Sequence, residues 1–163
     1  MPLTPAQREL LSRCFLFEGL PPEGFAEVTG GLSAEVYPAG EVIYSPRRFR
    51  RAMGVVLEGR LAVLKGKELL LKTLGPGQCF GAAAIFCPAE DYVTTVQARE
   101  PSAVVFLSNQ WLVELFGAYP QTSVAYIAFL SQRIRFLNRK IDSFTAPSAR
   151  ETLYPHLLAA EVD

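Results

Sequence analysis

The amino-acid sequence predicts a mainly β fold with flanking helices, in which a β-sandwich or barrel precedes one long C-terminal helix. Between Leu32 and Leu107, short apolar runs alternate with Gly and Pro at regular intervals, which is typical of a sandwich or barrel. On both sides of this region the apolar residues recur at helical spacing. The chain has 163 residues, and half of them are hydrophobic. This length and composition predict one domain with its own hydrophobic core and a smaller additional segment.

Two short helices are predicted before the β region. Thr4 and Gln7 have the spacing of a capping box, and Pro5 suits the first helical position. Gly and Pro residues between 19 and 22 interrupt this helix. A second helix is predicted over residues 23–30.

Short strands are predicted throughout the β region, with turns at the Gly and Pro positions between them. Four arginines fall within the five residues Arg47–Arg51, between two of these strands. The sequence favours a solvated hairpin tip for this segment, and the alternative is a site for a phosphate or an acidic partner. The predicted strands cover residues 35–37, 42–44, 54–57, 61–64, 69–71, 94–96 and 103–107.

Two further helices are predicted after the β region. Ser108 can cap a helix that extends to Phe116, and Pro120 introduces a long helix over about residues 121–144. Apolar residues on the long helix recur at alternating spacings of three and four, which is the a/d seam of supercoiled helices. This seam consists of Ile127, Leu130, Ile134, Leu137, Ile141 and Phe144.

The long helix also carries a second apolar stripe, which consists of Tyr126, Phe129 and Phe136. A helix with two apolar stripes is expected to pack against two different surfaces, one for each stripe. We therefore expect the β region on one side and the same helix of a second subunit on the other, in a symmetric homodimer. The alternative is that the seam packs on the chain's own barrel.

Composition narrows the function classes. Sixteen basic and sixteen acidic residues cancel, so the charge gives no reason to expect nucleic-acid binding by this segment itself. No apolar run has the length of a membrane span and no secretory signal opens the chain, so we expect a cytoplasmic protein.

Few residues in the chain are suited to metal or catalytic chemistry. Three cysteines without Cys-x-x-Cys spacing indicate a reduced compartment, and buried structural thiols are favoured over a redox switch at Cys79 and Cys87. His156 is the single histidine. We therefore predict no enzyme activity, no metal site and no cofactor.

Several segments, taken in their order along the chain, resemble the sensory half of a Crp/Fnr-type transcription regulator. The resemblance implies a β-roll, which is a double-stranded β-helix or jelly-roll barrel of the cyclic-nucleotide-binding type. It also implies a dimerisation helix and a C-terminal helix-turn-helix. A helix opened by Ser148 resembles the start of that DNA-binding domain, and the recognition helix would lie beyond the end of this chain. The segments are 16–20, 38–43, 56–61, 74–81 and 133–138.

This chain departs from the family at the two positions that carry the cyclic-nucleotide chemistry. The family's loop places a glutamate after its glycine, for the ribose, and an arginine about ten residues later, for the phosphate. Here Gly81 is followed by Ala82, and the arginine position is Tyr92. We therefore predict no physiologically useful binding of cyclic AMP or cyclic GMP.

The resemblance places the effector site on the barrel wall and the central helix. An apolar or aromatic small molecule fits these residues, with Asn138 as a polar contact. Asn138 could equally set the register of the helical dimer, and a further alternative is that the chain's own side chains fill the cavity. The expected effector site consists of Gly81, Ala82, Ala83, Tyr92, Val93, Leu137 and Asn138.

The sequence thus predicts the effector-sensing and dimerisation part of a bacterial Crp/Fnr-type regulator, degenerate for cyclic nucleotides. Residues 1–119 would form the sensory β-roll, 120–145 the dimerisation helix, and 146–163 the start of a truncated or absent helix-turn-helix. DNA would be bound only through a domain that this chain does not contain. The alternative is a stand-alone, non-DNA-binding domain that binds a small molecule or a protein partner.

Overall fold

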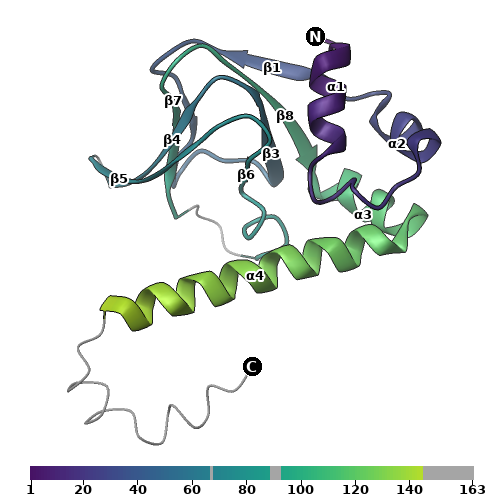
Figure 1. Ribbon diagram of the computed structural model, residues 1–163. Coiled ribbons are helices and arrows are strands. Elements are labelled where there is room, and N and C mark those ends of the chain that lie inside the picture. Colours follow the sequence, from purple (N-terminus) through teal and green to yellow (C-terminus); the bar gives the residue numbers. More distant parts are fainter. Residues whose placement is uncertain (67, 89–92, 145–163) are drawn as a thin grey trace, which may run out of the picture. The chain divides into compact units, whose positions relative to one another are not determined.

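The computed structural model describes residues 1–66, 68–88 and 93–144 (Figure 1). The chain divides into two compact units, Met1–Tyr126 and Ile127–Asp163. The first unit holds two four-stranded antiparallel sheets, with the strand orders β1-β8-β3-β6 and β2-β7-β4-β5. The strands are β1 (Ala34–Tyr37), β2 (Val42–Tyr44), β3 (Ala52–Glu58), β4 (Leu61–Lys65), β5 (Leu69–Leu74), β6 (Cys79–Phe80), β7 (Thr95–Ala98) and β8 (Ser102–Ser108).

The described residues also form four helices, and two of them start with the caps predicted from the sequence. Thr4 forms the predicted capping box with Gln7 at the start of α1 (Pro5–Ser12), and Ser108 accepts the Trp111 amide at the start of α3 (Asn109–Ala118). The remaining helices are α2 (Pro22–Thr29) and α4 (Pro120–Phe144). The predicted fold class is therefore confirmed.

Apolar side chains from both sheets pack together in a core cluster. Val56, Phe80 and Val104 come from the first sheet, and Tyr44 and Leu61 from the second. Strands β3 and β4 are almost wholly buried, so their runs of apolar residues lack the alternation of a half-exposed strand.

The predicted hairpin at Arg47–Arg51 is wrong. The strands on its two sides, β2 and β3, belong to different sheets and do not pair with each other. The segment instead crosses from one sheet to the other. A hairpin and a crossover carry the same turn residues, so the local sequence does not distinguish them.

Two further features differ from the sequence prediction, which included no strand at residues 79–80 and favoured burial of Cys87. The two-residue strand β6 pairs with β3, and it is too short to give a periodic signal in the sequence. Cys14 and Cys79 are buried as expected, but Cys87 is exposed.

The seam of the long helix is largely exposed on this single chain. Among its members, Ile127, Ile134, Leu137 and Ile141 are each more than half exposed, and Leu130 is half-buried. Phe144 ends the helix, and its side chain lies outside the described residues, as does the segment opened by Ser148.

Candidate functional site

The loop that follows β6 begins with a tight turn at Gly81. Gly81 has φ +81°, a backbone conformation that favours glycine. The Ala84 amide donates to the Gly81 carbonyl at 3.1 Å, and the Ala82 side chain is buried. We call residues 81–88 the cassette. From Gly81 to Pro88 it holds no acidic or basic side chain.

Two side chains hold the cassette backbone from different elements. The Tyr126 hydroxyl, in the first turns of α4, donates to the Ala82 carbonyl. The Arg51 guanidinium, just before β3, donates through Nη1 to the carbonyls of Ala84, at 3.3 Å, and of Cys87. The cassette is therefore tied to the start of the long helix and to the first sheet.

Aromatic rings surround the Tyr126 side chain. The rings of Phe15, Phe86 and Phe116 lie 6.3, 6.0 and 5.6 Å from its centroid. Tyr126 is 3% exposed, and burial raises the pKa of its hydroxyl above the ordinary value. Tyr126 is therefore a neutral hydrogen-bond donor at every physiological pH.

Phe80, the residue before the cassette, fills the interior of the first unit. Its ring lies 5.2 Å from the Tyr44 ring and 6.0 Å from the Phe106 ring, both edge to face. It packs directly over Gly54, where a Cβ atom would lie only 2.3 Å from the ring. This part of the interior is therefore aromatic and tightly packed.

The structure places the predicted effector residues as follows. Gly81, Ala82 and Ala83 lie together in the cassette, with only Ala82 buried. Val93 is 74% exposed. Tyr92 lies outside the described residues. Leu137 and Asn138 are exposed on α4 in the second unit.

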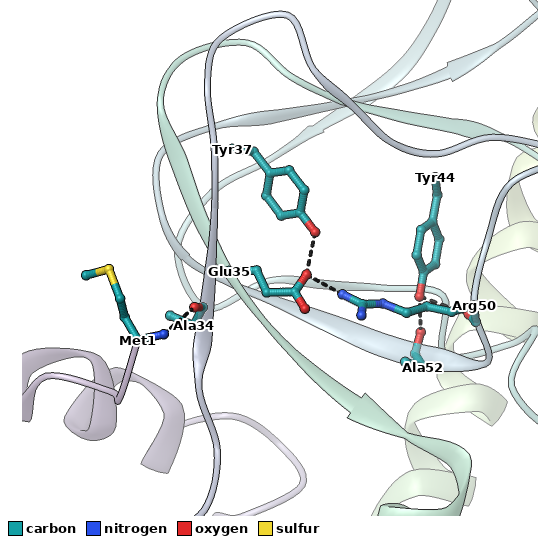
Figure 2. Close-up of polar contacts among 7 residues, drawn as sticks. All are labelled: Met1, Ala34, Glu35, Tyr37, Tyr44, Arg50 and Ala52. Carbon is teal, nitrogen blue, oxygen red and sulfur yellow. Dashed lines mark hydrogen bonds and ion pairs between the residues drawn. The ribbon is translucent and has the colours of Figure 1, made fainter.

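A polar group that the sequence did not reveal lies on β1 and the crossover segment. Figure 2 shows the Glu35 carboxylate between the Arg50 guanidinium and the Tyr37 hydroxyl, which donates to it at 2.7 Å. The Arg50 guanidinium also stacks on the Phe106 ring at 3.6 Å. The four clustered arginines indicated a charged group in this region. Glu35, the partner of Arg50, lies fifteen positions away along the chain, so the pairing could not be found from the sequence.

Electrostatics in this group favour the charged carboxylate. Burial by itself would raise the pKa of Glu35, but hydrogen bonds from Arg50 and Tyr37 outweigh it, so this pKa lies below its ordinary value. Burial and the neighbouring carboxylate raise the pKa of the Tyr37 hydroxyl. The group is thus an ion pair with a neutral tyrosine donor.

Within the described ranges, no group of three or more His, Cys, Asp or Glu side chains is placed to hold a metal ion. No helix in this part of the chain is both long enough and apolar enough to cross a membrane.

The family model described as "Cyclic nucleotide-binding domain" matches residues 34–119. The chain is 24% identical, over 137 residues, to the "CRP-like cAMP-activated global transcriptional regulator" of Mycobacterium tuberculosis. That alignment covers 82% of this chain and 61% of the relative, so the chain spans about three fifths of the length of this relative. It is also 24% identical over 147 residues to the "Cyclic AMP receptor protein" of Thermus thermophilus, covering 88% and 68% of the two chains.

Solved structures show the same fold. The catabolite activator protein of Thermus thermophilus superposes with a TM-score of 0.70 at 24% identity, covering 78% of this chain and 62% of that one. The sensor domain of the transcriptional regulator DNR from Pseudomonas aeruginosa superposes with a TM-score of 0.68 at 24% identity, covering 86% and 94%.

Proposed function

Because this chain belongs to the cyclic nucleotide-binding domain family, we propose that it is the effector-sensing and dimerisation part of a Crp/Fnr-type transcription regulator that does not respond to cyclic AMP. The observation that carries this proposal is the lack of charged side chains in the cassette, residues 81–88. The cassette lies at the end of β6 and is tied to α4.

The chemistry of the cassette argues against a cyclic nucleotide as effector. The cyclic phosphate is an anion and the ribose presents a hydroxyl donor, so both need polar or charged partners. Ala82 and Tyr92 cannot supply the carboxylate and guanidinium that such a ligand uses. Each lost charge-assisted contact costs roughly 1.5–3 kcal/mol, and about 1.4 kcal/mol corresponds to a tenfold loss of affinity. The two losses together weaken binding by about two to four orders of magnitude.

The surroundings of the cassette favour an uncharged effector instead. The Tyr126 hydroxyl bonds the Ala82 carbonyl, and the exposed Phe86 ring lies beside the Tyr126 ring, so the groups around Ala82 are aromatic and uncharged. We propose that the effector is a small apolar or aromatic molecule that contacts Gly81, Ala82, Ala83, Tyr92 and Val93, together with Leu137 and Asn138 of the helix.

The hydrogen bond from Tyr126 to Ala82 supports a route from effector to helix. An effector that shifts the cassette backbone must either keep this bond, and move the start of α4 with it, or break it. Either result changes the relative stability of two helix positions, which is what a ligand must do to shift a conformational equilibrium. The helix would then reposition the DNA-binding domains of a dimer.

The exposed seam supports a homodimer. Four apolar seam residues that are each more than half exposed form a continuous apolar stripe at a/d spacing, and a second copy of the helix would cover it. We propose that residues 1–119 form the sensory part, 120–145 the dimerisation helix, and 146–163 the start of a truncated or absent helix-turn-helix domain. DNA contact would come from a domain outside this chain.

Calorimetry with cyclic AMP tests the proposed loss of nucleotide binding. We expect no saturable heat up to about 1 mM ligand, in line with the affinity loss above. The cyclic AMP receptor protein of Thermus thermophilus serves as the positive control, because its name states the ligand. Micromolar or tighter binding of cyclic AMP by this chain would show that Ala82 and Tyr92 do not abolish the site.

Sedimentation of seam variants tests the dimer. We expect the double variant I134K/L137K to sediment as a monomer, because two buried charges per subunit would face each other across the seam. The matched control F136K/V113K also replaces two exposed apolar residues with lysine, but off the seam. A dimer that persists in I134K/L137K, or one that the control disrupts equally, would contradict the assignment.

Reading the gene beyond the codon for Asp163 tests the regulator itself. A frame that continues into a helix-turn-helix supports DNA binding by the whole protein. A frame without a DNA-binding domain would refute the regulator function and favour the stand-alone binding domain.

A further inference from the structure

A surface cavity of about 500 Å³ lies beside the crossover segment between β2 and β3. Strands β1 and β2 form one part of its wall, and residues Arg47–Arg50 form the other. No residue of the cassette lines it, so it is separate from the proposed effector site. Its volume falls in the usual range for small-molecule pockets, roughly 300–1,000 Å³.

The loop that carries the arginines is held in place at both ends. Ser45 and Arg48 exchange two backbone hydrogen bonds, of 2.9 and 3.1 Å. The Tyr44 hydroxyl lies 2.6 Å from the Ala52 carbonyl and 3.0 Å from the Arg50 carbonyl (Figure 2). A ligand that binds here therefore meets a largely preorganised loop and loses little free energy in ordering it.

One of the three lining arginines is already neutralised. Arg50 forms an ion pair with Glu35 and stacks on Phe106. This pair makes up one part of the cavity wall. It also fixes the Tyr37 ring, whose hydroxyl donates to Glu35.

The other two arginines carry charge that the described residues do not compensate. Arg47 and Arg48 are exposed, and in this part of the chain neither side chain forms an ion pair or a hydrogen bond. Glu41 is the other acidic residue in the lining, and it forms no ion pair with either of them. Two consecutive arginines that line one cavity match a dianion with several oxygen acceptors, such as a phosphate monoester, better than a single carboxylate.

The remaining wall is aromatic. Tyr37 and Phe49 are half-buried and pack against the core, and the Phe49 ring lies 6.4 Å from the Tyr44 ring. Half-buried rings at the edge of a pocket offer faces on which a planar ligand group stacks. The lining of the cavity thus combines unpaired cationic side chains with aromatic rings.

We propose that this cavity binds a small aromatic molecule that carries a phosphate monoester. Arg47 and Arg48 bind the phosphate, and the rings of Tyr37 and Phe49 contact the planar group. The ligand differs from a cyclic nucleotide, whose phosphate is a diester with one charge. The Tyr44 ring, which also lines the cavity, lies 5.2 Å from the ring of Phe80, the residue directly before the cassette.

Calorimetric titration with phenyl phosphate, in phosphate-free buffer at low salt, tests this proposal. The comparison ligands are phenol and inorganic phosphate. The test variant is R47A/R48A, and the matched control is R60A/R99A, which removes two exposed arginines elsewhere in the same unit. Melting curves followed by Trp111 fluorescence show whether each variant is folded. R47Q/R48Q repeats the comparison if the alanine variant loses its transition.

We expect saturable binding of phenyl phosphate that R47A/R48A weakens by about tenfold or more, as expected from the loss of charge-assisted hydrogen bonds. R60A/R99A should change the affinity by less than about twofold, because neither arginine lines the cavity and exposed charges that do not contact a ligand are partly screened. No saturation, or an equal loss in both variants, would overturn the site. Inorganic phosphate that binds as tightly as phenyl phosphate would overturn the aromatic part of the proposal.

Discussion

Replacing Gly54 with alanine should destabilise the protein, although it adds only one methyl group. Gly54 lies in the middle of β3 with an ordinary strand conformation, opposite Phe80 of β6. A Cβ atom there would lie 2.3, 2.5 and 2.8 Å from three carbon atoms of the Phe80 ring. Tyr44 and Phe106 hold this ring from other directions, so it has little room to move away.

Two opposing effects determine how much G54A changes the free energy of unfolding. The methyl group restricts the unfolded chain and by itself stabilises the folded state by about 0.4–1 kcal/mol. Overpacking in a well-packed core costs about 1–3 kcal/mol, and three contacts below 3.0 Å place this site toward the upper part of that range. The net result is a loss of about 1–2 kcal/mol in the free energy of unfolding.

Urea unfolding followed by the fluorescence of Trp111, the single tryptophan, measures this loss. With a urea dependence of about 2 kcal/mol per molar, the midpoint of G54A should fall by roughly 0.5–1 M. The control is G117A in α3, where a Cβ atom would meet nothing within 4 Å and alanine should stabilise the helix by up to about 1 kcal/mol. If G54A is as stable as the unmodified chain, the close packing of Phe80 against Gly54 is wrong. A less-than-additive loss in G54A/F80L would identify the ring as the cause.

Three further predictions concern single contacts. Y126F should lower the free energy of unfolding by about 1–3 kcal/mol, because the buried Ala82 carbonyl loses its donor. Y37F removes a hydroxyl that donates to the half-exposed Glu35 carboxylate and should matter less in the same urea titration, and equal losses would contradict the role of Tyr126. Glu35 should add stability above its unfolded pKa of about 4.3 and lose this contribution as the pH falls through its lower folded pKa. The difference in urea midpoint between the unmodified chain and E35Q should accordingly be constant from pH 7 to about pH 5 and shrink as the pH falls further, whereas a difference that grows on acidification would reverse the sign of the interaction. Cys87 is exposed while Cys14 and Cys79 are buried, and burial raises the pKa of Cys14, so a thiol reagent should label one cysteine rapidly in the folded protein and the other two only after unfolding. Rapid labelling of all three would show that the folded state opens around Cys14 and Cys79.

Features that depend on neighbouring residues could be predicted from the sequence. The capping box at Thr4, the cap at Ser108 and the long helix after Pro120 agree with the structure. The strands with long apolar runs were also found, because their signals extend over four or more residues. The two-residue strand β6 lacked such a signal and was recognised only by its pairing with β3.

Features that depend on contacts between distant residues could not be predicted. The crossover at Arg47–Arg51 was interpreted as a hairpin, since the same turn residues suit both connections. The ion pair between Arg50 and Glu35 joins residues fifteen positions apart, and the bond from Tyr126 to Ala82 joins residues forty-four apart. The close spacing of the four arginines suggested one shared role, but the structure gives them different ones.

The sequence by itself determined the class of fold, the positions of the helices and the absence of charged residues from the cassette. Each of these follows from residue type and local spacing, because backbone hydrogen bonding in helices and apolar periodicity are short-range properties. Only the tertiary structure decided which arginines are neutralised, where Phe80 packs, and how the cassette is tied to α4. These depend on which strands become neighbours. The burial of the whole core sets that arrangement, and no short segment determines it.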